Sequence, residues 1–183
     1  MERLCRNNII LIGFMGSGKT SVGRALAKGM EYHFLDTDVL IEQEEQQTIP
    51  TIFENKGEAY FRNRETQLLY DLLMSLEATV VSTGGGIPLR EQNRDLLRKL
   101  GFVVFLKASD DTIIRRLRDD TSRPLLVGEA LEHKVVQLQR EREPVYTAAA
   151  HSILKVDELS PIQLAHKIIE AYELFRTENQ AKT

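Results

Sequence analysis

A glycine-rich segment near the start of the chain carries a complete phosphate-binding pattern. Residues 13–20 read GFMGSGKT, which matches G-x-x-x-x-G-K-[ST], and an apolar run at residues 9–12 precedes them. Glycines let the backbone N–H groups face phosphate oxygens, and the helix that begins there adds its positive dipole end. This phosphate loop predicts a nucleoside triphosphate site with Mg²⁺ as cofactor. Its predicted binding residues are Gly13, Gly16, Ser17, Gly18, Lys19, Thr20 and Ser21.

The roles within the phosphate loop follow from its chemistry. Lys19 reaches the β- and γ-phosphates, and the Thr20 hydroxyl ligates Mg²⁺. A plain glycine-rich turn is the alternative, but an apolar run precedes the loop and an amphipathic helical pattern follows it. The order of the glycines is not the G-x-G-x-x-G of a dinucleotide-binding fold.

Two aspartates follow the second β-rich run. Asp36 and Asp38 lie where that strand ends, at the edge of the sheet where ligands of open α/β folds bind. Two carboxylates there can hold magnesium and accept a proton. Capping of the next helix is the alternative for Asp36 or Thr37, but it does not explain both aspartates. No aspartate ends the third run, so Asp36 is the predicted magnesium ligand.

An arginine and three consecutive glycines could recognise an acceptor that carries a carboxylate. Arg62 and Glu65 are three residues apart on one helix face, and an inward arginine binds a carboxylate through two parallel hydrogen bonds. Gly84, Gly85 and Gly86 follow the third run, where a backbone without side chains can approach a ligand. A tight structural turn would also use these glycines.

The elements that position these residues alternate along the chain. Five β-rich runs separated by helical patterns predict an α/β fold with a five-stranded parallel sheet flanked by helices. Gly29 and Gly101 stand where helix C-caps are expected, and Ser160 with Pro161 opens a last helix. The predicted strands are residues 9–12, 33–35, 79–82, 102–106 and 152–156.

Composition limits the class of protein. The 183 residues, 42% of them apolar, suffice for one core, and the net charge of −3 argues against general affinity for nucleic acid or anionic membranes. The only cysteine, Cys5, cannot form an internal disulfide, and no apolar run approaches the about 20 residues that span a bilayer. We expect a cytoplasmic monomer without nucleic-acid or membrane partners.

The motifs together make the chain resemble the shikimate kinase family from Ile9 to about Leu174. They are GFMGSGKTSVGRALA, FLDTD, IFENKGEAYFRNRE, STGGG, RPLL and REPVY, in family order. The resemblance implies a nucleoside-monophosphate-kinase-like P-loop fold. It also implies ATP-dependent phosphorylation of the shikimate 3-hydroxyl group, in aromatic amino-acid biosynthesis, with ATP and shikimate as substrates.

The resemblance also implies an organisation for the chain, residues 1–183, as a single domain. Residues 119–130 form a lid over ATP, and residues 38–76 form a helical segment that binds the acceptor. The core comprises residues 9–37, which include the phosphate loop, together with residues 77–118 and 131–175.

Residue roles follow from the same resemblance. Asp38 contacts the acceptor hydroxyls as general base, and Thr20 and Asp36 hold Mg²⁺, Asp36 through water or directly. The acceptor carboxylate binds to Arg62 and Arg142, beside the backbone of Gly84, Gly85 and Gly86. The ATP contacts are Arg123 on the transferred phosphate, Arg116 against adenine and Pro161 near it.

Alternatives remain for two arginines and for the activity. Arg116 has Arg115 and Arg118 as neighbours, and any of the three could form a solvated helix face. Arg123 could pair with Asp119 or Asp120 at the surface. Another small-molecule P-loop kinase, for gluconate or a nucleoside monophosphate, would not require Asp38, Arg62, the glycines and Arg142 together. A non-enzymatic nucleotide-binding module would not need Lys19, Asp38 and Arg123.

Overall fold

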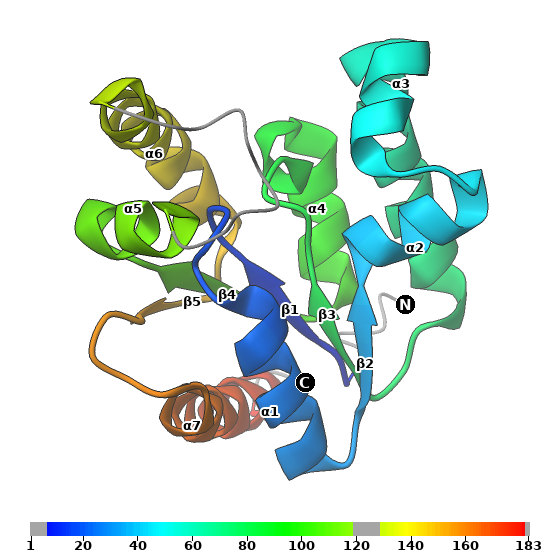
Figure 1. Ribbon diagram of the computed structural model, residues 1–183. Coiled ribbons are helices and arrows are strands. Elements are labelled where there is room, and N and C mark those ends of the chain that lie inside the picture. The colour runs from blue at the N-terminus through cyan, green and yellow to red at the C-terminus, as the bar shows by residue number, and fades with distance from the viewer. Residues whose placement is uncertain (1–6, 119–128, 182–183) are drawn as a thin grey trace.

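Five parallel strands form one sheet in the part of the chain that this computed structural model describes, residues 7–118 and 129–181 (Figure 1). The strand order is β2-β3-β1-β4-β5. The five predicted strands and the fold class are confirmed, with small shifts at three strand ends. The strands are β1 (Ile9–Ile12), β2 (His33–Asp36), β3 (Thr79–Ser82), β4 (Phe102–Lys107) and β5 (Ser152–Lys155).

Helices cover both faces of the sheet. On one face α1 packs against α7, and on the other face α4 packs against α6, while α2 and α3 stand together beyond β2 (Figure 1). The helices are α1 (Lys19–Met30), α2 (Thr37–Glu45), α3 (Ile49–Ser75), α4 (Glu91–Leu100), α5 (Asp110–Arg118), α6 (Glu129–Ala149) and α7 (Pro161–Gln180), with a 3₁₀ turn η1 (Ile87–Leu89).

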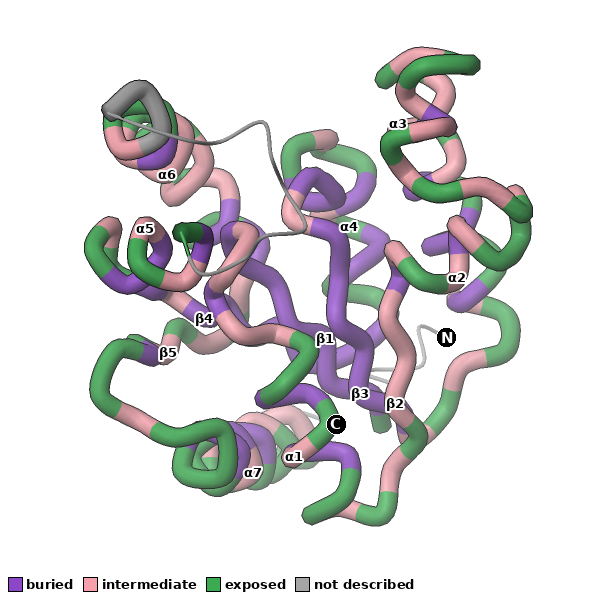
Figure 2. Tube along the Cα trace, in the orientation of Figure 1, coloured by how far each residue is buried: buried purple, intermediate pink, exposed green. Residues whose placement is uncertain are grey.

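Burial is highest in the central strands. Every residue of β1 and β3 is buried, as the continuous purple of Figure 2 shows, whereas the edge strands β2 and β5 are partly exposed. Parallel strands that are covered on both faces read as apolar runs, which explains why the sequence pattern located them. The loops that leave the buried strands therefore start from a rigid platform.

The two predicted glycine caps have different outcomes. Gly101 is the C-cap of α4, where a Cβ atom would overlap the carbonyl oxygen of Asn8, so this prediction is confirmed. The prediction for Gly29 is wrong, because α1 continues through it and ends at Glu31 in the left-handed conformation (φ 57°). A Cβ atom at Gly29 would meet only Ile169 Cδ1, at 3.8 Å, so the site does not need glycine.

The helical segment predicted at residues 38–76 contains two breaks. Helix α2 ends at Gln46 in the left-handed conformation, and Thr48 caps α3 by accepting a hydrogen bond from Thr51 N–H. Inside α3, Gly57 has φ 80° and ψ 166°, which kinks the helix. Glu45 joins the two sides of the kink, since it accepts hydrogen bonds from Lys56 at 2.7 Å and from Tyr60 at 2.8 Å.

The last helix begins as the sequence predicts. Ser160 and Gln163 form a capping box at the start of α7, and Pro161 occupies its first turn. None of the helices within the described residues is both long enough and apolar enough to cross a bilayer.

Candidate active site

The candidate residues meet at one edge of the sheet. The phosphate loop leaves β1, Asp36 ends β2, and Thr83 with the three glycines, here called the glycine loop (residues 83–86), leaves β3. These strands are adjacent and parallel, with Ser82 opposite both Leu11 and Asp36. Their carboxyl ends therefore bring two loops and a carboxylate to one place, as expected for a ligand site in this fold.

The phosphate loop is shaped by close backbone approach. A Cβ atom at Gly13 would lie 2.7 Å from the carbonyl oxygen of Leu106, so a larger residue would displace the loop. Gly18 has φ 93° immediately before α1. Lys19 Nζ donates hydrogen bonds to the carbonyl oxygens of Gly13 and Phe14, both at 2.9 Å. The lysine thus lies across the loop, with its charge at the start of the helix.

Asp36 uses its two oxygens differently. Its Oδ1 accepts a hydrogen bond from Asp38 N–H at 3.1 Å and caps α2, while its Oδ2 accepts one from Thr20 Oγ1, also at 3.1 Å. The capping alternative therefore holds for Asp36 without removing it from the site, and Asp38 is not the cap. A hydroxyl and a carboxylate beside the phosphate loop suit Mg²⁺, which binds through few protein oxygens and completes its shell with phosphate and water.

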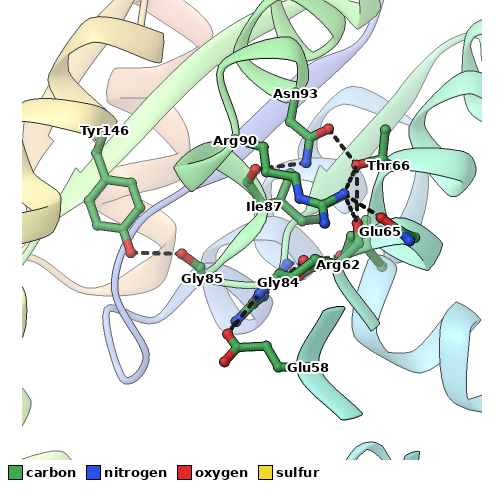
Figure 3. Close-up of polar contacts among 12 residues, drawn as sticks. Glu58, Arg62, Glu65, Thr66, Gly84, Gly85, Ile87, Arg90, Asn93 and Tyr146 are labelled. Atoms are coloured by element: carbon green, nitrogen blue, oxygen red, sulfur yellow. Dashed lines mark hydrogen bonds and ion pairs between the residues drawn. The ribbon is translucent and has the colours of Figure 1, made fainter. Parts of the chain in front are cut away.

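Five residues from α2, α3 and the glycine loop form the candidate acceptor site, of which Figure 3 labels Arg62, Glu65 and Gly84. Arg62 Nη1 donates to Glu65 Oε2 at 2.8 Å, and both belong to α3. A Cβ atom at Gly84 would overlap Asp38 Oδ1, and one at Gly86 would overlap the Arg62 guanidinium. Glycine is therefore required at both positions for the carboxylate and the guanidinium to reach the loop.

Glu65 is a site residue that the sequence analysis missed. Its side chain is 1% exposed, and its Oε1 has no hydrogen-bond partner among the described residues. Burial raises the pKa of Glu65 from 4.5 to about 7, against the opposing effect of Arg62, and the nearby charge of Asp38 adds to the rise. The Arg-x-x-Glu spacing placed Glu65 on the face of Arg62 but did not indicate its burial.

Arg62 has a second carboxylate partner. Glu58 Oε1 accepts from Arg62 Nε at 3.2 Å and from Nη2 at 3.0 Å, and the Glu58 side chain is 66% exposed (Figure 3). Burial disfavours the charge on Arg62, but its hydrogen bonds to Glu65 and Glu58 hold its pKa above the usual value. The guanidinium is thus charged and oriented by two glutamates of its own helix.

Buried polar side chains hold the glycine loop and the turn η1 that follows it. Thr37 Oγ1 accepts a hydrogen bond from Gly84 N–H at 2.8 Å. Asn93 donates to the carbonyl oxygen of Ile87 at 2.9 Å and accepts from Thr66 at 2.9 Å, which links η1 to α3 (Figure 3). These three hydrogen bonds are buried, and they make the glycine loop and the turn after it rigid.

Arg142 reaches the same region from α6. Its guanidinium carbon lies 5.6 Å from the centre of the Phe14 ring, which belongs to the phosphate loop. Burial raises the pKa of Tyr146, and the charges of Arg142 and Arg62 both oppose that rise. The charges of the two predicted carboxylate-binding arginines therefore both act on one buried tyrosine.

Arg116 and Pro161 lie on the other side of the phosphate loop. Arg116 Nη1 donates to the carbonyl oxygen of Gly16 at 2.9 Å, whereas Arg115 and Arg118 are exposed. Among the three arginines, Arg116 is thus the one that contacts the loop. It borders a cavity of about 240 Å³, whose other lining residues are Ser17, Gly18, Ser21, Val22, Leu159, Pro161 and Leu164.

Arg123 lies outside the described residues, as does most of the predicted lid. Of the segment 119–130, only residues 129 and 130 are described, and they begin α6. The roles predicted for Arg123 and for the lid stay predictions.

The chain resembles known proteins over most of its length. The family model for shikimate kinase matches residues 15–173. The shikimate kinase of Thermodesulfovibrio yellowstonii is 41% identical over 91% of this chain and 95% of that protein. The structure of shikimate kinase from Acinetobacter baumannii in complex with shikimate superposes with a TM-score of 0.83, at 40% identity, over 93% of both chains.

More distant structures share only the fold. A gluconokinase from Sinorhizobium meliloti superposes with a TM-score of 0.58 at 18% identity, over 96% of this chain and 99% of that one. The likeness supports the kinase-like P-loop architecture but carries no statement about the acceptor.

Proposed function

The chain belongs to the shikimate kinase family, and we infer that it is an ATP-dependent kinase that phosphorylates shikimate. We propose that the 3-hydroxyl group is the acceptor and that shikimate 3-phosphate, an intermediate of aromatic amino-acid biosynthesis, is the product. The observation that carries the proposal is the packing of Asp38 and Arg62 against Gly84 and Gly86, beside the phosphate loop. A carboxylate and a guanidinium there match an acceptor that has hydroxyls and a carboxylate.

The donor side would use the residues around the phosphate loop. Its backbone N–H groups and Lys19 would bind the phosphates of ATP, with phosphate oxygens replacing the carbonyls of Gly13 and Phe14 as acceptors for Lys19. Thr20 and Asp36 would hold Mg²⁺, which neutralises phosphate charge when bound. The adenine ring of ATP would occupy the cavity beside Arg116 and Pro161.

On the acceptor side, Asp38 would orient the attacking hydroxyl and accept its proton. Its carboxylate already lies against Gly84, while the next two glycines approach the phosphate loop (Gly85) and Arg62 (Gly86). Arg62 and Arg142 would bind the acceptor carboxylate, because a planar guanidinium presents two parallel donors to it. The protein does little covalent work in such a reaction, so positioning and charge stabilisation supply most of the catalysis. Arg123 would add its charge to the transferred phosphoryl group.

We also propose that the protein works as a monomer in the cytoplasm, without nucleic-acid or membrane partners. The net charge of −3 supports the lack of affinity for polyanions.

An acceptor panel tests the proposed function. The purified protein is incubated with ATP and Mg²⁺ and with shikimate, quinate, gluconate or AMP, and ADP release is followed. We expect shikimate to give the highest kcat/KM. Faster turnover with gluconate or AMP would contradict the acceptor assignment, and the absence of turnover with every acceptor would favour a nucleotide-binding module.

A further inference from the structure

Tyr146 is a buried residue of α6 whose hydroxyl reaches the glycine loop. Its side chain is 1% exposed, and its ring lies 5.1 Å from the ring of Phe105 in β4. The hydroxyl donates a hydrogen bond to the carbonyl oxygen of Gly85 at 2.8 Å (Figure 3). The ring is thus part of the core, while the hydroxyl binds the glycine loop.

Gly85 lies where the two substrate sites meet. A Cβ atom on Gly85 would be 3.4 Å from the carbonyl oxygen of Gly13 and 3.7 Å from the backbone nitrogen of Met15, both in the phosphate loop. Its neighbours Gly84 and Gly86 pack against the candidate acceptor residues. A rotation of the peptide after Gly85 would therefore alter the acceptor site and the wall that it shares with the phosphate loop.

The hydroxyl of Tyr146 also has a charged neighbour. Arg142 is four residues earlier on the same face of α6, and its charge acts on the Tyr146 hydroxyl by opposing the rise of the Tyr146 pKa. Arg142 also lies against Phe14. One phenol thus stands between the glycine loop and an arginine that the proposed function assigns to the acceptor carboxylate.

We propose that Tyr146 is a positioning residue that holds Gly85 and Arg142 in the arrangement that binds the acceptor. The proposal rests on the proposed function, since it assumes that the glycine loop and Arg142 form the acceptor site. The physical reason is that a buried hydroxyl fixes a backbone carbonyl at low entropic cost, whereas a loop rich in glycine has little rigidity of its own. Tyr146 would act through these groups and not on the reacting atoms.

Replacing Tyr146 with phenylalanine removes the hydroxyl and keeps the ring. In Tyr146→Phe we expect the KM for shikimate to rise by about 5- to 10-fold, as for a lost hydrogen bond, with the Kd of ATP measured without acceptor changed by less than about 2-fold. Tyr172→Phe is the matched control, because Tyr172 is 2% exposed and packs on Phe102 in another part of the core. Its kinetic constants should stay at the wild-type values.

Hydrogen exchange gives a readout that does not depend on catalysis. In Tyr146→Phe the amides of residues 84–87 should exchange about 10-fold faster than in the wild type, and those of Tyr172→Phe should not change. If the wild type did not phosphorylate shikimate but exchange was still faster in Tyr146→Phe, the proposed function would be wrong. The hydrogen bond from Tyr146 would still be shown to anchor the loop. A wild-type KM for shikimate or unchanged exchange in Tyr146→Phe would overturn the positioning role, as would an equal rise in both KM values with a lowered Tm.

Discussion

Arg62 and Glu65 form an ion pair with a 2.8 Å contact whose two ends differ in solvent exposure. The Arg62 side chain is 18% exposed and the Glu65 side chain 1%. Part of the Arg62 guanidinium is therefore accessible to an acceptor, whereas the Glu65 carboxylate is buried beneath it. Because the charge of Glu65 is buried, the pair links the acceptor site to the pH dependence of the fold.

The first prediction concerns the pH dependence of stability. The pKa of Glu65 is about 7 in the folded chain and 4.5 for the free side chain, so the folded chain binds this proton more tightly. The resulting contribution to the free energy of unfolding is complete below pH 4.5 and is lost as the pH rises toward 7, by about 3 kcal/mol at most. Glu65→Gln should lack this loss.

Urea unfolding at several pH values between 4.5 and 8 measures the effect. The wild type minus Glu65→Gln difference in unfolding free energy should decrease with pH across this window. A difference that is independent of pH would show that Glu65 titrates near its ordinary value.

The second prediction concerns a titration of opposite sign at His151. Val103 N–H donates to His151 Nδ1 at 2.9 Å, and the imidazole stacks on Phe102 with ring centres 5.9 Å apart. His151 is exposed as a residue, but its ring packs on Phe102 and Phe175, and this partial burial lowers the pKa of His151 to about 4, with the charge of Arg98 acting in the same direction. Because the unfolded chain then binds the proton more tightly, this stability is present above pH 6.5 and is lost as the pH falls toward 4.

The two titrations oppose each other between pH 4.5 and 6.5. His151→Asn keeps an acceptor for Val103 N–H but does not titrate, so it should remove the loss of stability on the acid side. Below pH 6.5, the free energy of unfolding should fall less steeply with decreasing pH in His151→Asn than in the wild type, and more steeply in Glu65→Gln. Parallel curves for His151→Asn and wild type would contradict the lowered pKa.

The third prediction tests carboxylate recognition by Arg62. Arg62→Lys keeps the charge but loses the planar pair of donors, so the KM for shikimate should rise, and Arg62→Ala should raise it by tens to thousands of fold, on the order of 2–5 kcal/mol. The KM for ATP should change much less. Arg176→Lys, at an exposed site on α7, is the control. Equal rises for both substrates would indicate misfolding.

The fourth prediction tests Asp38 as the base. Asp36 supplies the cap of α2, so Asp38→Asn leaves the helix start intact and should change the Tm little. Loss of the base should lower kcat by roughly 10²-fold while ATP binding is retained. Titration with nucleotide and steady-state kinetics measure both quantities, with Asp95→Asn on the exposed side of α4 as the control. A nearly unchanged kcat would refute the base role.

The sequence predicted much of the fold because the central strands are buried on both faces. Runs such as residues 9–12 have no polar position, and the loops after them carry the site. The kink at Gly57 and the end of α2 at Gln46 were not predicted, since the pattern around them is helical on both sides. Their positions depend on contacts such as those of Glu45, which join residues distant in sequence.

The candidate site was predictable only in part. The loop motif identifies Lys19 and Thr20 by spacing alone, whereas Glu65 becomes a site residue through its burial behind Arg62, which only the packing of α3 on the glycine loop establishes. The choice of Arg116 among three arginines follows from the fold as well. The buried Thr112 and Ile113 of α5, four and three residues before Arg116, share its helix face, a periodicity that could have selected it from the sequence.

The last prediction compares two glycines that the sequence could not rank. A Cβ atom at Gly84 would overlap Asp38 Oδ1 and lie 3.2 Å from Glu65 Oε1, whereas one at Gly29 would make an ordinary contact of 3.8 Å with Ile169. Gly84→Ala must therefore displace the Asp38 carboxylate or the loop. Gly29→Ala adds only a better helix former inside α1, which should raise the free energy of unfolding by about 0.5–1 kcal/mol.

Kinetics and chemical denaturation of the two variants separate these effects. Gly84→Ala should lower kcat/KM for shikimate by at least about 100-fold, because small displacements of reacting groups cost that much, with the Kd of ATP near the wild-type value. Gly29→Ala should keep wild-type kinetics and unfold at higher urea concentration. Wild-type turnover in Gly84→Ala would mean that the carboxylate of Asp38 need not lie against the glycine loop, and the placement of the base beside the phosphate loop would then have to be abandoned.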